Sequence, residues 1–262
     1  EYQINDRMSF MRFLGINLCE KVPDAKTIWK FKNDLAETET VDKLFCMFDE
    51  HLEKEGLISH KGTIVDATFV DAPRQRNSRD ENKKIKNGEI PEEWEKPENK
   101  SKLAQKDIDA NWTKKNGERH FGYKDHVKCD ADSKLITNYS VTSASVHDSQ
   151  RCLVFIGQED KVLYADSAYS GKPIALALPE NCKNQICEKG YRNSPLTSEQ
   201  KMNNRRKSRI RCRIEHIFGF MTGAMHGITI RSIGITRAWM NIGITNLVYN
   251  FCRYSYLKRT SA

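Results

Sequence analysis

The sequence predicts an α/β protein, and three observations support this fold class. Runs rich in β-branched and aromatic residues, bounded by turn residues, predict strands. Apolar residues at spacings of three and four predict helices before, between and after these strands. A long polar tract interrupts the pattern after the first strand. The strands are expected at residues 62–73, 119–129, 135–143, 161–166 and 183–188.

Composition narrows the functional classes. Among the 262 residues, 43 Lys and Arg outnumber 35 Asp and Glu, and the net charge of +8 favours a polyanionic partner, with nucleic acid first. Eight cysteines without a C-x-x-C pair disfavour a zinc finger or a disulfide framework, and predict reduced thiols in a cytosol. The sequence has neither a run of roughly eighteen apolar residues nor a secretory pattern, so we expect a soluble, intracellular protein without a membrane partner.

Residues 1–60 predict a small helical N-terminal region. One helix begins near Asp6 and ends at Gly15, a second follows Pro23, and a third begins near Thr40. Three short helices are compatible with a helix-turn-helix module. A plain helical packing layer is the favoured interpretation.

The first strand carries an acid in its middle. Strand alternation puts Ile64, Asp66, Thr68 and Val70 on one face, where apolar packing is expected. An unpaired carboxylate there would cost several kcal/mol. Asp66 therefore requires a basic partner, a cluster of backbone N–H groups, or a metal ion.

The polar tract 74–116 has too few apolar residues to form a core of its own. We expect an insertion or a loop that becomes ordered on contact with something else. Its acidic middle is interpreted as solvated surface, whereas its basic start and the segment 112–115 are candidates for contact with phosphates.

An antiparallel hairpin follows, formed by residues 119–129 and 135–143 around a turn at 130–133. His120, Gly122, Lys124 and His126 share one face of its first arm. Two histidines without a third ligand favour a surface or DNA-facing role over zinc. A helix is then expected through Ile156.

Two further acids occupy unusual positions. Asp166 ends a short apolar strand and precedes a turn of small residues and a helix at 172–178, the position at which open α/β sheets bind ligands. Glu215 lies in a strongly basic helix predicted over residues 198–222, where a pair with Arg211 one turn earlier is the simplest interpretation. A core helix at 235–256 completes the predicted fold.

A shared Mg²⁺ site would explain the unusual positions of Asp66, Asp166 and Glu215, because hard divalent ions bind carboxylates together with phosphate oxygens. At this point the chain resembles the DDE transposases of bacterial insertion sequences. The resemblance covers nearly the whole chain, and the motifs that carry it are Val65-Asp66-Ala67-Thr68 with Ala72-Pro73, His120-Phe121-Gly122-Tyr123-Lys124, Ala165-Asp166-Ser167-Ala168-Tyr169-Ser170-Gly171 and Arg211-Cys212-Arg213-Ile214-Glu215-His216, together with the opening Asp6-Arg7-Met8-Ser9-Phe10, Phe13-Leu14-Gly15 and Val22-Pro23-Asp24.

The resemblance implies a ribonuclease H-like mixed sheet flanked by helices over residues 61–262, with the polar insertion at 74–116. Residues 1–60 would be the remnant of an end-binding domain. Asp66, Asp166 and Glu215 would hold Mg²⁺, for which Mn²⁺ may substitute, for cleavage at the element's ends and transfer of the 3′-hydroxyl into target DNA.

The expected partner is double-stranded DNA, both transposon ends and target, on which the protein would assemble as a homo-oligomer in the bacterial cytoplasm at the nucleoid. The residues expected to contact DNA are Lys124, His120, Tyr169, Arg205, Arg206, Arg209 and Arg211. For Tyr169, stacking on an unpaired base and packing in the core are equally supported.

The chain also departs from the family pattern. Of the Tyr-Arg-Glu-Lys signature around the third acid it keeps only Arg211 and Glu215, with Ser208 and Thr222 at the other two positions. Such transposases also carry more chain ahead of residue 1, so part of the end-recognition domain is expected to be missing. The alternatives are a ribonuclease H-like nuclease without strand transfer, and a catalytically idle DNA-binding derivative.

Overall fold

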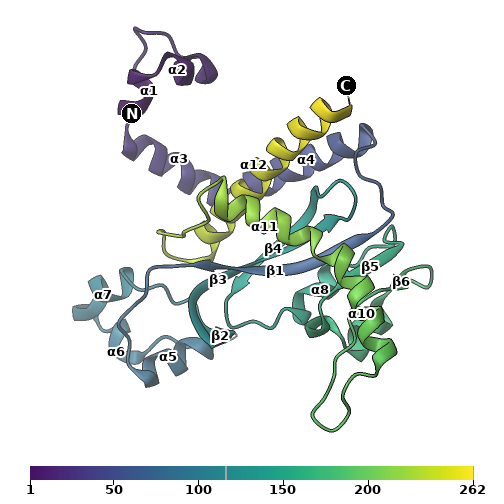
Figure 1. Ribbon diagram of the computed structural model, residues 1–262. Helices are drawn as coiled ribbons and strands as arrows, with labels where there is room; N and C mark the ends of the chain where they lie inside the picture. The colour runs from purple at the N-terminus through teal and green to yellow at the C-terminus, as the bar shows by residue number, and fades with distance from the viewer. Residues whose placement is uncertain (116, 262) are drawn as a thin grey trace.

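A computed structural model describes residues 1–115 and 117–261. Within them, six strands form one mixed sheet (Figure 1). Five of them follow the order β2-β3-β1-β5-β6, and β4 pairs with the part of β3 that β2 does not cover. β1 runs antiparallel to β3 and parallel to β5. The strands are β1 (Thr63–Asp71), β2 (Asn111–Lys115), β3 (Glu118–Asp130), β4 (Ile136–Ser143), β5 (Val162–Ala165) and β6 (Lys183–Asn184).

Helices cover both faces of this sheet. On one face, α4 (Thr40–Lys54), α11 (Arg213–Gly223) and α12 (Ile235–Ser261) enclose the larger core, to which β1 contributes Ile64. On the other face, α8 (Ser149–Phe155) and α9 (Lys172–Ala177) enclose a smaller core around Val65. Adjacent residues of β1 thus face different cores, as strand alternation requires. The predicted α/β class and the predicted mixed sheet flanked by helices are confirmed.

The β3–β4 hairpin forms as predicted, and its turn is stabilised by Asp130. The Asp130 Oδ1 accepts the backbone N–H groups of Asp132 and Ser133 at 3.0 and 2.7 Å. Lys134 takes the left-handed φ of 59° that returns the chain into β4. β6 is only two residues long, shorter than the predicted strand at 183–188.

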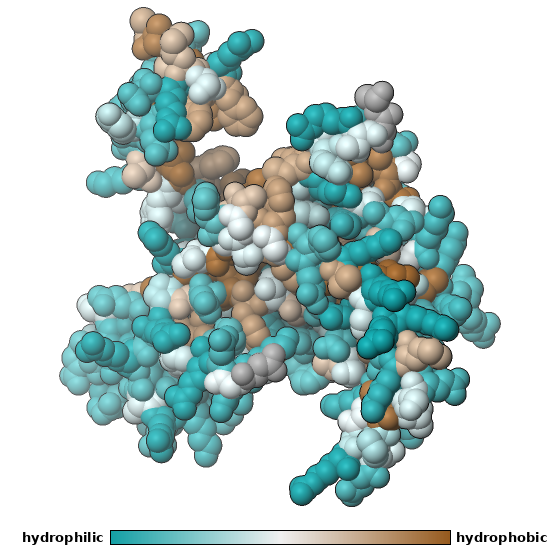
Figure 2. All heavy atoms as spheres, viewed as in Figure 1, coloured by the Kyte–Doolittle hydropathy of each residue, from teal (hydrophilic) through white to brown (hydrophobic). Residues whose placement is uncertain are grey.

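The N-terminal helices are α1 (Tyr2–Asp6), α2 (Met8–Leu14) and α3 (Ala25–Glu37). Gly15 ends α2 with a left-handed φ of 67°, and Asp24 caps α3 by accepting the Thr27 N–H at 2.7 Å. α1 and α2 lie apart from the sheet at the end of an arm (Figure 1). Apolar side chains gather on this arm, and Phe13 is 87% exposed (Figure 2).

The polar tract forms an insertion, one of the two predicted alternatives, and it contains helices of its own. It forms α5 (Arg79–Lys86), α6 (Glu92–Glu95), the 3₁₀ turn η1 (Pro97–Asn99) and α7 (Lys100–Ala104), and then returns to the sheet as β2. Trp94 is completely buried and donates to Glu81 at 2.8 Å, while Glu81 closes a capping box with Ser78. The buried indole and the capping box thus anchor α5 and α6 to each other.

The basic helix predicted over residues 198–222 is broken in two. α10 (Ser198–Arg211) and α11 meet at Cys212, whose ψ of −10° turns the chain. α10 buries no side chain, whereas α11 buries Ile214 and Ile217 under the sheet. The break therefore separates a solvated basic helix from a core helix. In the described part of the chain, no helix is long and apolar enough to cross a membrane.

Candidate active site

Asp66 lies in β1, and Asp166 directly follows the neighbouring parallel strand β5. The β1–β5 register aligns Ile64 with Tyr164, and both side chains contact the larger core. Two residues further along the chain in each case, the alternation returns to this face at Asp66 and Asp166. Asp166 follows β5 with an extended backbone and caps the 3₁₀ turn η2 (Ser167–Tyr169) through the Ser167 N–H. The sheet thus brings together two acids that are far apart in the sequence.

Arg211 connects the third acid to this pair. Its Nη1 donates to Asp66 Oδ2 at 2.8 Å, and its Nη2 donates to Glu215 Oε1 at 3.1 Å. Asp66 also accepts the backbone N–H of Ala67 at 2.8 Å. Of the compensations expected for a carboxylate in this strand, the basic partner is therefore present, a single backbone N–H stands in place of a cluster, and the expected Arg211–Glu215 pair forms as well.

Burial and neighbouring charges act against each other at Asp66. Burial raises the pKa of its carboxyl, and the nearby Asp166 carboxylate raises it further. The Ala67 N–H and the cations of Arg211 and Lys115 lower it. Burial also lowers the pKa of the Arg211 guanidinium, but the surrounding carboxylates outweigh this effect and raise it overall. Asp66 and Arg211 thus form a mutually dependent, partly buried pair.

The donor chemistry of this site fits a divalent cation. Carboxylate oxygens are the ligands that Mg²⁺ prefers, and the guanidinium of Arg211 shows that the site holds positive charge. As arranged, no group of three or more His, Cys, Asp or Glu side chains within residues 1–115 and 117–261 is placed to hold a metal ion. The Glu215 side chain is 60% exposed and bonds to Arg211.

The predicted DNA contacts of Lys124 and Tyr169 differ from what the structure shows. Lys124 is 7% exposed, and its Nζ donates at 2.7 Å both to Asp148 Oδ1 and to the carbonyl of Val146. Tyr169 is 1% exposed and belongs to the smaller core. Neither side chain can reach a phosphate or a base without leaving its packed position. For Tyr169, the core alternative describes this structure.

The other predicted DNA contacts are accessible to different extents. Arg205, Arg206 and Arg209 are exposed on α10. His120 is half-buried, with its ring stacked on Phe69 at a centroid distance of 4.2 Å. α10 therefore offers a basic surface, whereas His120 is mainly a packing residue.

Sequence reasoning missed two charged residues near the acids. Lys115 is close enough to lower the pKa of Asp66, although only its membership of a basic segment was recognised. Asp148 precedes α8 without a side-chain cap hydrogen bond and pairs with Lys124. A lysine within an alternating strand is the signal that could have indicated a buried acidic partner for Lys124.

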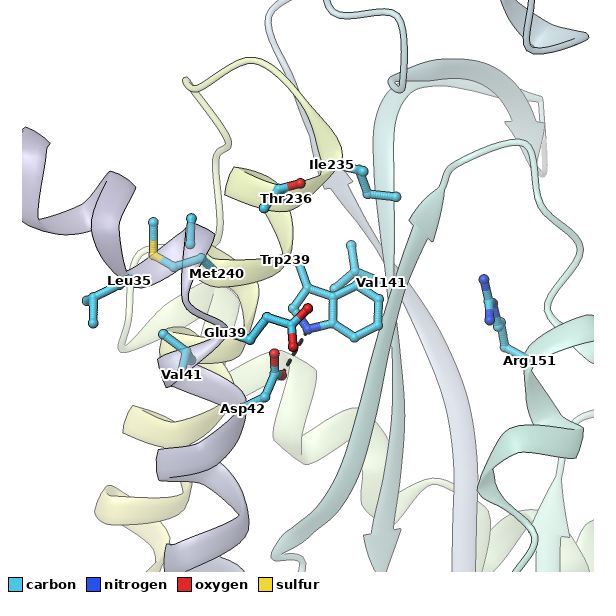
Figure 3. Close-up of a pocket in the computed structure, with 11 residues that line it drawn as sticks. Leu35, Glu39, Val41, Asp42, Val141, Arg151, Ile235, Thr236, Trp239 and Met240 are labelled. Atoms are coloured by element: carbon cyan, nitrogen blue, oxygen red, sulfur yellow. Dashed lines mark hydrogen bonds between the residues drawn. The ribbon is translucent and has the colours of Figure 1, made fainter.

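An apolar cavity of about 540 Å³ lies away from the acids, between α3, α4, α12 and β4 (Figure 3). Leu35, Trp239 and Met240 contribute to its lining. Asp42 at its edge already accepts hydrogen bonds from Trp239 Nε1 at 2.9 Å and from the Tyr139 hydroxyl. Asp42 thus joins α4 to α12 and to β4.

Comparisons with known proteins identify the family of this chain. A second transposase domain model (DUF772) matches residues 1–34. A solved structure of the piggyBac transposase, in a synaptic complex with hairpin DNA, is similar over 95% of this chain and 58% of that one, with a TM-score of 0.41 and 9% sequence identity. The model described as Transposase DDE domain matches residues 58–251, so the chain belongs to the DDE transposase family.

Proposed function

We propose that this protein is a DNA transposase that cleaves DNA at the ends of an insertion sequence and transfers the freed 3′-hydroxyl into target DNA. Membership of a family that generally uses divalent metal ions supports this proposal. The observation that carries it is the position of Asp66 in β1 and of Asp166 directly after the neighbouring parallel strand β5, with Glu215 bound to the same arginine as Asp66.

Asp66, Asp166 and Glu215 would hold Mg²⁺, or Mn²⁺ in its place. When bound, the ions would activate a water molecule for nicking and the 3′-hydroxyl for joining. The chain itself would provide carboxylates on a rigid sheet, and positioning of this kind supplies most of the catalysis in phosphoryl transfer. Arg211 would leave the acids and, with the α10 arginines, bind phosphates that orient the DNA without reading its sequence.

The partners in this proposal are transposon-end and target DNA, on which a homo-oligomer would assemble at the nucleoid in the cytoplasm. Residues 1–60 would contribute to binding of the element's ends, and residues 61–262 would be the catalytic domain. The net charge of +8 supports a polyanionic partner.

The decisive experiment incubates the protein with labelled element ends, a target plasmid, and Mg²⁺ or Mn²⁺. We expect nicked ends and joined products. Asp66→Asn, Asp166→Asn and Glu215→Gln should each reduce both products by at least about a thousandfold, because a metal ligand supplies several kcal/mol of charge stabilisation.

Asp132→Asn is the matched control, because this acid lies in the β3–β4 turn and pairs with Arg213. It should leave both products unchanged. Nicks without joined products would favour the nuclease, and binding without either product would favour the idle derivative. Full activity of the Asp166→Asn variant would contradict the assignment of the acids.

A further inference from the structure

A cavity of about 620 Å³ lies between the insertion and the edge of the sheet. Four cations line it and no acid does: Arg79 and Lys86 from α5, Lys114 from β2, and Arg119 from β3. Among the described residues, none of the four makes an ion pair. The space-filling view shows hydrophilic side chains over this part of the molecule (Figure 2). We name these four side chains and the space between them the insertion groove.

Two of these cations face each other directly. Lys114 and Arg119 are register partners in the β2–β3 ladder. Like charges at directly opposed strand positions destabilise a sheet, and an acidic neighbour normally relieves them. No acid lines the insertion groove. A folded protein that maintains this repulsion has a local surplus of positive charge available to an external anion.

The insertion groove is connected to the acids through β2. The Nζ of Lys115, the neighbour of Lys114, lies 5.6 Å from the centre of the Phe69 ring, and Phe69 belongs to β1, the strand that carries Asp66. α10 contacts β5, on the opposite side of β1 from β2 (Figure 1). A strand reaching Asp66 therefore has one basic surface on each side.

Trp112 indicates what this groove binds. Its ring carries the Arg74 guanidinium at 5.8 Å and packs against Phe121 with centroids 5.1 Å apart. The ring thus already contacts a cation and another aromatic ring. Neutral hydrogen-bonding side chains complete the lining, namely Gln75, Asn77, Asn82, Thr113 and Ser145. Cations combined with amides and hydroxyls suit phosphate oxygens.

We infer that the insertion groove binds the phosphodiester backbone of DNA on the side of the reacting phosphate opposite to α10. The inference rests on the proposed function, in which the bound polyanion is DNA. The insertion would make a DNA contact that α10 cannot make. Because phosphates carry no sequence information, this contact would hold any duplex in place across the acids.

The test measures binding of a 30-base-pair duplex of arbitrary sequence at several salt concentrations, in EDTA so that no chemistry occurs. The groove variant combines Arg79→Gln, Lys114→Gln and Arg119→Gln. Its log–log salt slope should fall by about 2.7, since each phosphate contact contributes about 0.9. A second variant adds Arg205→Gln, Arg206→Gln and Arg209→Gln to these three substitutions. The decreases in salt slope caused by the two sets should add, as expected for separate contacts.

The control variant carries Lys54→Gln, Lys161→Gln and Lys183→Gln, three exposed cations outside the groove. It loses three positive charges, as the groove variant does, and its salt slope should equal that of the wild type. An unchanged slope in the groove variant would overturn the inference and leave the proposed function standing. A loss confined to single-stranded DNA, with the duplex slope unchanged, would indicate base stacking and would also overturn it. A reduced slope in a protein that neither nicks nor joins would support the groove and contradict the proposed function.

Discussion

Arg211 and Asp66 are 145 residues apart in the chain, yet Nη1 of the arginine lies 2.8 Å from Oδ2 of the aspartate. The same guanidinium reaches Glu215 through its other nitrogen. One cation therefore holds two acids that a metal ion would have to hold during the proposed reaction. Metal binding and the arginine bridge should exclude each other.

Arg211→Gln tests this competition. Without metal, the variant should lose about 1–3 kcal/mol of unfolding free energy, because partly buried Asp66 is left without its cation. Its affinity for Mn²⁺ should rise, because a competing positive charge is gone. Urea unfolding and titration followed by Mn²⁺ electron paramagnetic resonance measure the two effects.

Arg213→Gln is the control for that prediction. Arg213 bonds to Asp132 and to the carbonyl of Ala131 in the hairpin turn, away from the acids. Its loss should leave Mn²⁺ affinity unchanged. Equal or weaker Mn²⁺ binding by Arg211→Gln would show that the bridge does not compete with metal.

The exposed arginines of α10 should contribute to DNA binding irrespective of sequence. Replacing Arg205, Arg206 and Arg209 together by Gln should lower the salt slope by about 0.9 for each lost phosphate contact. Fluorescence anisotropy with two unrelated duplexes measures this change. A slope equal to that of the wild type would show that this face of α10 is only solvated.

Tyr169 should behave as a core residue in stability measurements. Tyr169→Ala should lower the unfolding free energy by about 3–5 kcal/mol, as for other large aromatics removed from a core. Tyr169→Phe should be neutral or slightly stabilising, because the hydroxyl is buried without a hydrogen-bond partner among the described residues. Urea titration distinguishes the variants. A stable Ala variant that cleaves only ends already unpaired would restore the stacking role.

Asp125 should make stability depend on pH. It is completely buried beside Asn246, and burial raises its pKa from 3.8 to about 8. The folded state therefore retains a proton that the unfolded state loses, so this contribution is fully present below about pH 4 and declines as pH rises to about 8. Asp125→Asn should remove the decline and be more stable than wild type at pH 8.

The measurement compares unfolding free energies of the two proteins between pH 4 and 8. The difference should grow by at most about 1.4 kcal/mol per pH unit. Burial lowers the pKa of neighbouring His126 from 6.5 to about 4, which acts in the opposite direction over the acidic part of this range. The difference between the proteins isolates Asp125, and a constant difference would refute its protonation.

Much of the fold could be predicted locally. Hydrophobic periodicity and caps located most of the helices and strands, for example the helix that begins after Asp24 and the hairpin that turns at Asp130. These features are set by residues a few positions apart. The same local reasoning singled out Asp66, because a carboxylate among β-branched residues is costly wherever the strand packs.

Only the tertiary structure decided which side chains are accessible and which distant residues meet. Lys124 and Tyr169 are buried because a helix and a second core cover them, and nothing in their own segments specifies that cover. The break at Cys212 follows from packing of one half of a basic helix under the sheet. The Arg211–Asp66 bond depends on the approach of two segments 145 residues apart. Sequence determined the chemical groups that this protein carries, and long-range packing decided which of them face DNA, a core or each other.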